Sequence, residues 1–158
     1  MFVGLGGNVG DVLKRIPQAI AELSEIPRTC LLAKSSLYRT VPVGIENQPD
    51  FVNAVAKLRT DLSAKELLAE LQLMERRHGR VRREKNGPRT LDLDLLVYDG
   101  LVSTDPSMMI PHPRMHERAF VLLPLSEIAP ESVIPGHGPI GALLAKLPAQ
   151  GVTRLHAA

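Results

Sequence analysis

Two aspartates and a basic loop are the part of this sequence whose residue types are best suited to chemistry. The segment GRVRREKNGPRTLDLDLLVYDG spans residues 79–100, and residues 91–95 alternate leucine and aspartate. Because successive side chains of a β-strand point to opposite faces, Asp92 and Asp94 are predicted to share one face. Two residues rise roughly 6.6 Å along a strand, so the two carboxylates can converge on one small volume.

Carboxylates this close together need a compensating positive charge. Neighbouring anions repel unless a cation lies between them or one is protonated. Mg²⁺ typically binds one or two carboxylates together with substrate phosphates. The alternative is an ordinary half-exposed strand with solvated aspartates. Two features argue against it, because Asp is disfavoured in strands and residues 96–98 are apolar on both faces.

Positive charge is concentrated immediately before this strand. Residues 76–90 contain seven arginines and lysines and one acid, so the segment carries +6 while the whole chain carries +2. Arginine guanidinium groups bind phosphate oxygens in bidentate fashion. Metal-binding carboxylates beside such a loop suit a polyphosphate, although a solvated charge run or a nucleic-acid patch would have the same composition.

The composition sets bounds on domain number and compartment. A chain of 158 residues that is 44% hydrophobic predicts a single domain over residues 1–158, which we expect to be a monomer. The single cysteine, Cys30, excludes an internal disulfide framework, and no signal peptide is recognisable, so the cytoplasm is expected. No apolar stretch approaches the ~20 residues of a membrane-spanning helix, so no membrane partner is expected.

The rest of the sequence must supply the elements that position these groups. Strands are predicted over residues 2–5, 29–39, 51–58 and 91–98. Helices are predicted from Asp11 as N-cap, from a Ser63–Glu66 capping box to about Gly79, over 115–126 and over 142–147. Asp99-Gly100 predicts a hairpin whose second strand, residues 101–103, returns antiparallel. The tail from residue 148 shows no pattern.

This order of elements predicts the fold class. It reads βαββαβ, followed by an added hairpin strand and C-terminal helices. Strands packed under two helices, with few parallel crossovers, indicate an α+β sandwich of the ferredoxin-like type.

Four polar residues are candidate contacts, and each has a structural or solvent-facing default. Asn53 lies among apolar neighbours and is either a satisfied structural amide or a ligand-reading one. Gln72 and Glu75 flank the apolar stripe of the second helix near the basic loop, and by default they face solvent. His112 lies between two prolines and is either a phosphate contact or a surface imidazole, the latter being favoured when the residue is taken alone.

Several stretches together resemble one protein family. They are, in order, Gly6-Gly7-Asn8, Ser36-Leu37-Tyr38-Arg39-Thr40, Gln48-Pro49-Asp50-Phe51-Val52-Asn53, Gly79-Arg80-Val81-Arg82, Gly87-Pro88-Arg89-Thr90-Leu91-Asp92-Leu93-Asp94 and Pro111-His112. At these separations the sequence resembles the 6-hydroxymethyl-7,8-dihydropterin pyrophosphokinases of folate biosynthesis over nearly the whole chain. The block at residues 87–94 is the most specific part.

The resemblance implies an activity and a set of residues for it. Members transfer the terminal pyrophosphate of ATP to the hydroxymethyl group of a reduced pterin and release AMP, with two Mg²⁺ ions that Asp92 and Asp94 would hold. The implied catalytic arginines are Arg80 and Arg82 of the closing loop. The implied pterin-binding residues are Thr40, Val41, Pro42, Val43, Phe51, Asn53 and Phe120. The implied ATP-binding residues are Gln72, Glu75, Arg82, Arg89, His112 and Arg118.

Two other functions fit parts of the pattern. A non-catalytic nucleic-acid module would use the basic loop, but closely spaced exposed aromatics for base stacking are missing and the aspartates would repel phosphate. Steep salt-dependent binding of a random oligonucleotide without Mg²⁺ would favour it. A different metal-dependent nucleotidyl or phosphoryl transferase is separated by its nucleotide product, since ordinary kinase chemistry yields ADP.

Overall fold

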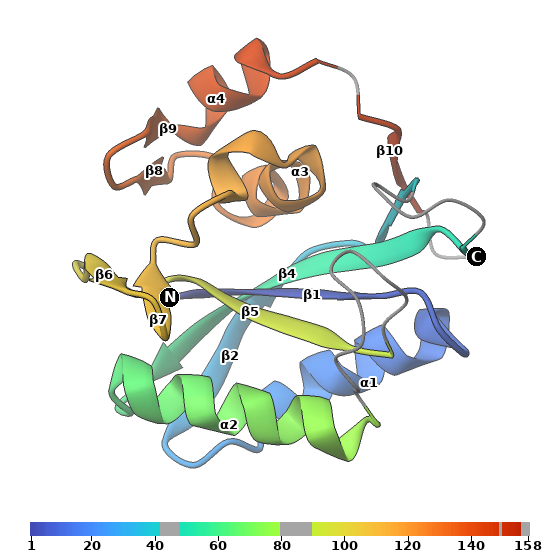
Figure 1. The fold of residues 1–158 in the computed structure, drawn as a ribbon, viewed down its shortest axis with the longest axis vertical. Coiled ribbons are helices and arrows are strands. Elements are labelled where there is room, and N and C mark those ends of the chain that lie inside the picture. The colour runs from blue at the N-terminus through green and yellow to red at the C-terminus, as the bar shows by residue number, and fades with distance from the viewer. Residues whose placement is uncertain (42–47, 80–89, 149, 156–158) are drawn as a thin grey trace.

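An antiparallel sheet of six strands lies at the centre of the molecule (Figure 1). The computed structural model describes residues 1–41, 48–79, 90–148 and 150–155. The elements in chain order are β1 Phe2–Gly7, α1 Val12–Leu23, β2 Thr29–Lys34, β3 Tyr38–Thr40, β4 Phe51–Thr60, α2 Ala64–Arg77, β5 Asp92–Val97, β6 Ser103–Asp105, β7 Met108–Ile110, the 3₁₀ turn η1 Met115–Glu117, α3 Ala119–Ile128, β8 Val133–Ile134, β9 Gly138–Pro139, α4 Ile140–Lys146 and β10 Val152–Arg154.

Helices cover both faces of this sheet. The strands run in the order β10-β3-β4-β1-β5, and β2 also pairs with β4. Helices α1 and α2 lie against one face, and α3 and α4 lie on the other side (Figure 1). Two apolar cores result, one containing Leu67 and Leu93 and the other containing Leu96 and Leu122. The fold is therefore a combination of α-helices with an antiparallel β-sheet.

Most of the predicted elements are confirmed, with small changes of boundary. The predicted alternation in β5 is confirmed, since Leu93 and Leu95 are both buried in the core that also contains Leu67 of α2. The capping box of α2 is present, since Glu66 N donates to Ser63 Oγ at 3.1 Å and Ser63 N donates to Glu66 Oε1 at 2.9 Å. Asp11 occupies the N-cap position of α1, but its side chain makes no capping hydrogen bond.

The single strand predicted over residues 29–39 is wrong, because the chain forms β2 and β3 with a break between them. Both pieces pair with β4, which is long enough to hold them end to end. At the break, Ser35 N donates to Val55 O at 2.9 Å, and Val55 N donates to the Ser35 hydroxyl at 2.9 Å. The hydroxyl therefore takes the place of a backbone carbonyl in the ladder, which lets the edge bend.

The predicted hairpin is confirmed as a turn and wrong as a strand pairing. Leu101 N donates to Tyr98 O at 2.9 Å, and Gly100 has a φ of 71°. The following residues do not return along β5, because β6 pairs instead with β7 in a separate two-stranded sheet. Along β5 itself, the carbonyl of Leu96 accepts a hydrogen bond from His112 N at 2.8 Å.

The C-terminal third also differs from the prediction. The helix expected over residues 115–126 is divided into η1 and α3 at Arg118, whose backbone is extended with φ −112° and ψ 107°. The loop predicted over residues 135–141 contains β9, which pairs with β8. The tail without a sequence pattern contributes β10, which pairs with β3 at the edge of the main sheet. Strands β9 and β10 are thus defined by the strands with which they pair, and β3 lies far from β10 in the sequence.

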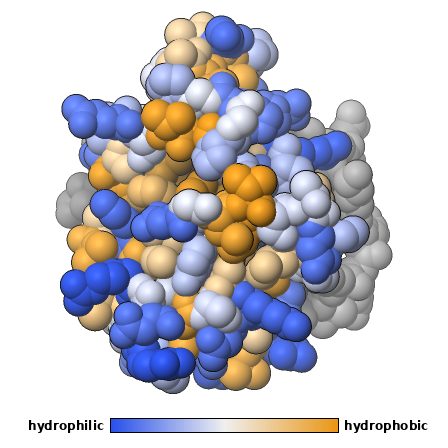
Figure 2. All heavy atoms as spheres, turned by 90° about the vertical axis from the view of Figure 1, so that its left-hand side faces the viewer, coloured by the Kyte–Doolittle hydropathy of each residue, from blue (hydrophilic) through white to orange (hydrophobic). Residues whose placement is uncertain are grey.

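Hydrophilic and hydrophobic side chains are intermingled on the face seen in Figure 2, which therefore shows no continuous apolar surface. Single exposed apolar residues, such as Val102 and Val133, are normal for a folded protein. None of the helices in the described ranges has the length and hydrophobicity that a membrane span requires.

Candidate functional site

A cavity of about 460 Å³ lies between the sheet and the start of α3. Strands β1, β4 and β5 contribute one side of it, and η1 and α3 contribute the other. Its lining consists of Gly4, Leu5, Gly6, Thr40, Val41, Phe51, Asn53, Ala54, Asp92, Asp94, Leu96, Arg114, Glu117, Arg118, Phe120, Val121 and Gln150. The structure thus brings together residues from both ends of the chain.

Asp92 and Asp94 face this cavity from one side of β5, as the alternation predicts. Both are half-buried, and their partners on β1 are glycines, with Asp92 opposite Gly6 and Asp94 opposite Gly4. No side chain on β1 therefore fills the space beside the two carboxylates.

Two carboxylates beside an open floor fit a magnesium site. The described residues contain no cluster of three or more His, Cys, Asp or Glu side chains suited to a metal. The remaining ligands would be water and phosphate oxygens, which is how Mg²⁺ is usually bound at nucleotide sites.

A buried amide on β4 adds a further polar group to the sheet side of the cavity. Asn53 Nδ2 donates to Thr40 Oγ1 at 2.9 Å, and both residues are almost fully buried. A Cβ atom at Gly6 would lie 2.6 Å from Asn53 Oδ1. Glycine at this position therefore allows the Asn53 side chain to occupy its place between the strands.

Aromatic and basic groups complete the lining. Phe51 at the start of β4 and Phe120 in the first turn of α3 are both half-buried in the cavity wall. The guanidinium carbon of Arg118 lies 5.4 Å from the centroid of the Phe120 ring, in cation–π contact. A flat ligand could pack against aromatic faces here while an anionic group meets Arg118.

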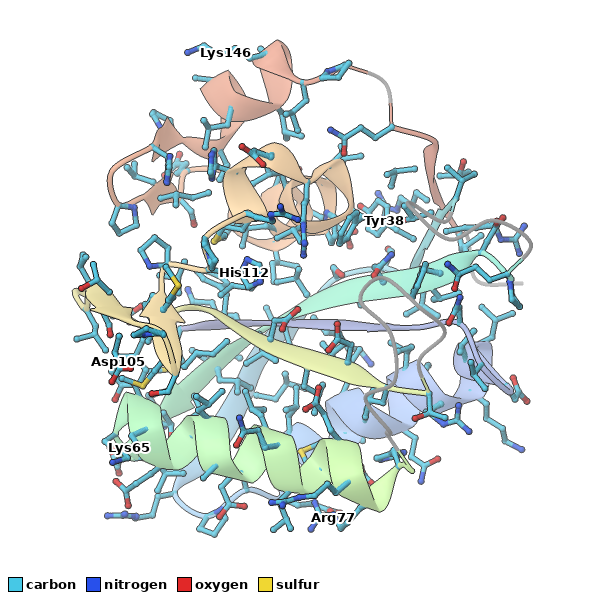
Figure 3. All side chains as sticks on the ribbon, in the orientation of Figure 1. Tyr38, Lys65, Arg77, Asp105, His112 and Lys146 are labelled. Atoms are coloured by element: carbon cyan, nitrogen blue, oxygen red, sulfur yellow. The ribbon has the colours of Figure 1, made fainter. Side chains whose placement is uncertain are left out.

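His112 lies between the sheet and α3 (Figure 3) and is not a plain surface imidazole. Its Nδ1 accepts a hydrogen bond from Arg114 N at 3.2 Å, which places the proton of the neutral ring on Nε2. Burial lowers the pKa of His112 to about 4, with Arg118 and Arg114 acting in the same direction and Asp92 opposing them. The ring is therefore neutral at pH 7.

Gln72 and Glu75 lie on α2, and neither belongs to the described lining of the cavity. Gln72 is exposed, as expected. The solvent-facing default is wrong for Glu75, which is 5% exposed and whose Oε2 accepts a hydrogen bond from Leu93 N at 2.8 Å. This carboxylate holds the edge strand β5 through the backbone N–H group of Leu93.

The remaining predicted residues lie outside the described part of the chain. They are Pro42, Val43, Arg80, Arg82 and Arg89. Three polar residues of the cavity lining were missed by the sequence analysis, namely Arg114, Glu117 and Gln150. The charges of Arg114 and Glu117 close to Arg118 were a usable signal, whereas nothing around Gln150 distinguishes it from an ordinary surface residue.

Comparison with known proteins shows the family to which the chain belongs. The sequence profile of the 7,8-dihydro-6-hydroxymethylpterin-pyrophosphokinase (HPPK) family matches residues 2–130, which is most of the chain. The chain belongs to this family. It is accordingly an enzyme of the pyrophosphokinase class, a transferase of folate biosynthesis.

Three bacterial relatives are between 41% and 48% identical to the chain. The 2-amino-4-hydroxy-6-hydroxymethyldihydropteridine pyrophosphokinase of Haemophilus influenzae is 43% identical over 134 residues, covering 85% of this chain and 84% of its own. The enzyme of the same name from Pseudomonas aeruginosa is 41% identical over 155 residues, covering 98% and 96%. That of Synechocystis sp. is 48% identical over 136 residues, covering 86% and 69%.

Proposed function

We propose that the protein transfers the terminal pyrophosphate of ATP to the hydroxymethyl group of 6-hydroxymethyl-7,8-dihydropterin. The hydroxyl oxygen forms a bond to the β-phosphorus, the bond from that phosphorus to the α–β bridging oxygen breaks, AMP leaves, and the hydroxyl proton is released. The observation that carries the proposal is the meeting of Asp92 and Asp94 with Phe51, Asn53 and Phe120 in one cavity of an HPPK-family chain.

The residues divide into two groups by the part of the reaction that they serve. Phe51 and Phe120 sandwich the pterin ring, while Asn53 and the segment Thr40, Val41, Pro42 and Val43 bind its polar edge. Aromatic side chains suit this role because their faces stack on a planar heterocycle. The position of Asn53 is supported by its hydrogen bond to Thr40, which keeps the amide in a fixed orientation.

The second group binds the triphosphate. Asp92 and Asp94 hold two Mg²⁺ ions, which neutralise phosphate charge and increase the acidity of the attacking hydroxyl when they are bound. Gln72, Glu75, Arg89, His112 and Arg118 contact the nucleotide. His112 would do so as a neutral ring that donates its Nε2 proton, in keeping with its low pKa.

The basic segment before β5 acts as the arginine-rich closing loop in this proposal. Arg80 and Arg82 approach the phosphates and neutralise the charge that develops during transfer. Phosphoryl transfer depends chiefly on such positioning and electrostatic stabilisation, and it needs little covalent participation from the protein. The composition of residues 76–90 supports this role.

We also propose that the fold is of the ferredoxin-like type, with one domain over residues 1–158. The support is the central order β4-β1-β5 with β2 and β3 outside β4, all antiparallel and joined through α1 and α2 on one face. We also expect a monomer, and the cytoplasm remains the expected compartment because the single cysteine, Cys30, cannot form an internal disulfide.

The decisive experiment is to incubate the protein with ATP, Mg²⁺ and the hydroxymethyl pterin and to separate the nucleotides by chromatography. AMP is the expected product, and ADP would mean ordinary kinase chemistry instead.

Asp94→Asn should reduce turnover roughly 100-fold or more while the protein still folds, because a metal ligand is lost. Asp61→Asn, an exposed aspartate outside the cavity, is the matched control and should retain turnover. Retained activity in the Asp94 variant would contradict the metal assignment.

A further inference from the structure

The segment that joins η1 to α3 forms one wall of the cavity. Glu117, Arg118 and Phe120 all line it, and so does Gln150 from the chain just before β10. Arg118 has an extended backbone at the exact junction of η1 and α3, so its side-chain direction depends on the two peptide groups that flank it. Part of each peptide group is bonded locally, since Arg118 N donates to Met115 O at 3.2 Å and Arg118 O accepts from Val121 N at 3.0 Å. The N–H group of Ala119 needs another partner, because the first N–H groups of a helix have no intrahelical acceptor.

The side-chain amide of Gln150 supplies a partner on each side of Arg118. Its Oε1 accepts a hydrogen bond from Ala119 N at 2.9 Å, and its Nε2 donates to Glu117 O at 3.0 Å. The side chain of Arg118 makes no capping hydrogen bond at the start of α3, and Arg118 belongs to the lining of the cavity. One amide thus holds the chain immediately before and after Arg118.

Gln150 is itself anchored to the opposite wall. The next residue, Gly151, accepts a hydrogen bond from Val41 N at 3.4 Å, and β10 then pairs with β3. Gly151 has a φ of 65°, and a Cβ atom there would lie 2.8 Å from Val41 Cγ2. The chain at residues 150–151 therefore connects the wall that contains Val41 with the wall that contains Arg118.

We propose that Gln150 is a positioning residue of the substrate site, a role that rests on the proposed function. By fixing the peptide groups on both sides of Arg118, its amide keeps the Arg118 guanidinium and the Phe120 ring directed into the cavity. It also sets the spacing between this wall and the Thr40–Val41 wall. Gln150 does not act on the reacting atoms, so its loss should weaken substrate binding more than the chemical step.

The test is steady-state kinetics of Gln150→Leu, which keeps the size of the side chain and removes both hydrogen bonds. KM for the pterin should rise about tenfold, the change expected for losing one to two hydrogen bonds, while kcat changes less. Gln150→Glu keeps the acceptor for Ala119 N and loses the donor to Glu117 O, so it should also raise KM. This second variant decides the matter if the leucine variant fails to fold.

Two controls separate positioning from general support of the C-terminal strand. Arg154→Gln disturbs β10 through the contacts of Arg154 with Ser36 and Glu127, and it should leave KM unchanged. In an Arg118→Ala background, Gln150→Leu should have a clearly smaller effect than in the wild type, because residues that act through one another are not additive.

Unchanged KM in both Gln150 variants would overturn the proposal. So would a fully additive loss in the Arg118→Ala background, or an equal loss in Arg154→Gln accompanied by a lower unfolding midpoint. The wild-type protein is assayed first. A wild type without turnover contradicts the proposed function, whereas an active wild type with unaffected Gln150 variants contradicts only this inference.

Discussion

At the scale of single residues, the lack of a side chain at Gly6 leaves room for the Asn53 amide in the cavity wall. Gly4→Ala and Gly6→Ala form a matched pair on β1, because a Cβ at Gly4 would meet Leu96 carbons at an ordinary 3.4 Å while one at Gly6 would lie 2.6 Å from Asn53 Oδ1. We expect Gly6→Ala to lower the free energy of unfolding by about 1–3 kcal/mol more than Gly4→Ala, since the buried amide must move. Equal denaturant midpoints for the two variants would contradict this.

His112 makes a pH-dependent contribution to stability. Its folded pKa is about 4, below its ordinary value, so the unfolded chain binds the proton more tightly between about pH 4 and 6.5. Stability should therefore rise with pH across this window and level off above it. Compared with His112→Gln, the wild type should lose more stability when the pH is lowered from 7 to 4.5. Parallel stability profiles of the two proteins, measured by denaturant titration, would contradict the assignment.

At the scale of elements, Glu127 connects α3 to strand β3. Its carboxylate accepts hydrogen bonds from Ser36 N at 2.9 and 3.0 Å and from the Tyr38 hydroxyl at 2.8 Å, and Tyr38 lies beside α3 in Figure 3. Burial and the carboxylate raise the pKa of Tyr38 to about 12, which keeps the hydroxyl a donor. Burial alone would raise the pKa of Glu127, but these hydrogen bonds lower it overall.

Glu127→Gln should therefore loosen the attachment of α3. The variant puts an amide N–H group against donors, and we expect a loss of about 1–3 kcal/mol in the free energy of unfolding near pH 7. Because the folded pKa of Glu127 is depressed, its contribution is present above the unfolded value and is lost as the pH falls through the folded one. Glu131→Gln, at an exposed position after α3, is the control. The two variants should unfold alike in strong acid.

At the scale of the whole molecule, nucleotide binding should be linked to folding through the metal. ATP with Mg²⁺ at about 100 times its dissociation constant should raise the unfolding midpoint by roughly 5–10 °C. ATP with excess EDTA should give a much smaller shift, because the carboxylates of Asp92 and Asp94 then repel the triphosphate. A double Asp92→Asn and Asp94→Asn variant should lose the Mg²⁺ dependence. The unfolding midpoints are measured by calorimetry. An equal shift of the midpoint with and without Mg²⁺ would argue against metal-mediated binding.

Local patterns in the sequence determined many of the structural elements of this protein and the placement of its two aspartates. The alternation of leucine and aspartate placed Asp92 and Asp94 on one face, because the side-chain period of a strand is two. The capping box of Ser63 and Glu66 fixed the start of α2, since both partners lie within one helical turn. The resemblance of the chain to its family rested on residues that are close together in sequence.

Only the tertiary structure decided which distant segments meet. Glu75 is buried because β5 packs against α2 and offers the N–H group of Leu93, a contact that the helical pattern alone could not indicate. The position of Gln150 depends on β10 joining the main sheet, and a three-residue strand has too little local pattern to be recognised. Hydrogen bonds between residues far apart in the chain form only when the whole fold packs, so no short stretch of sequence can predict them.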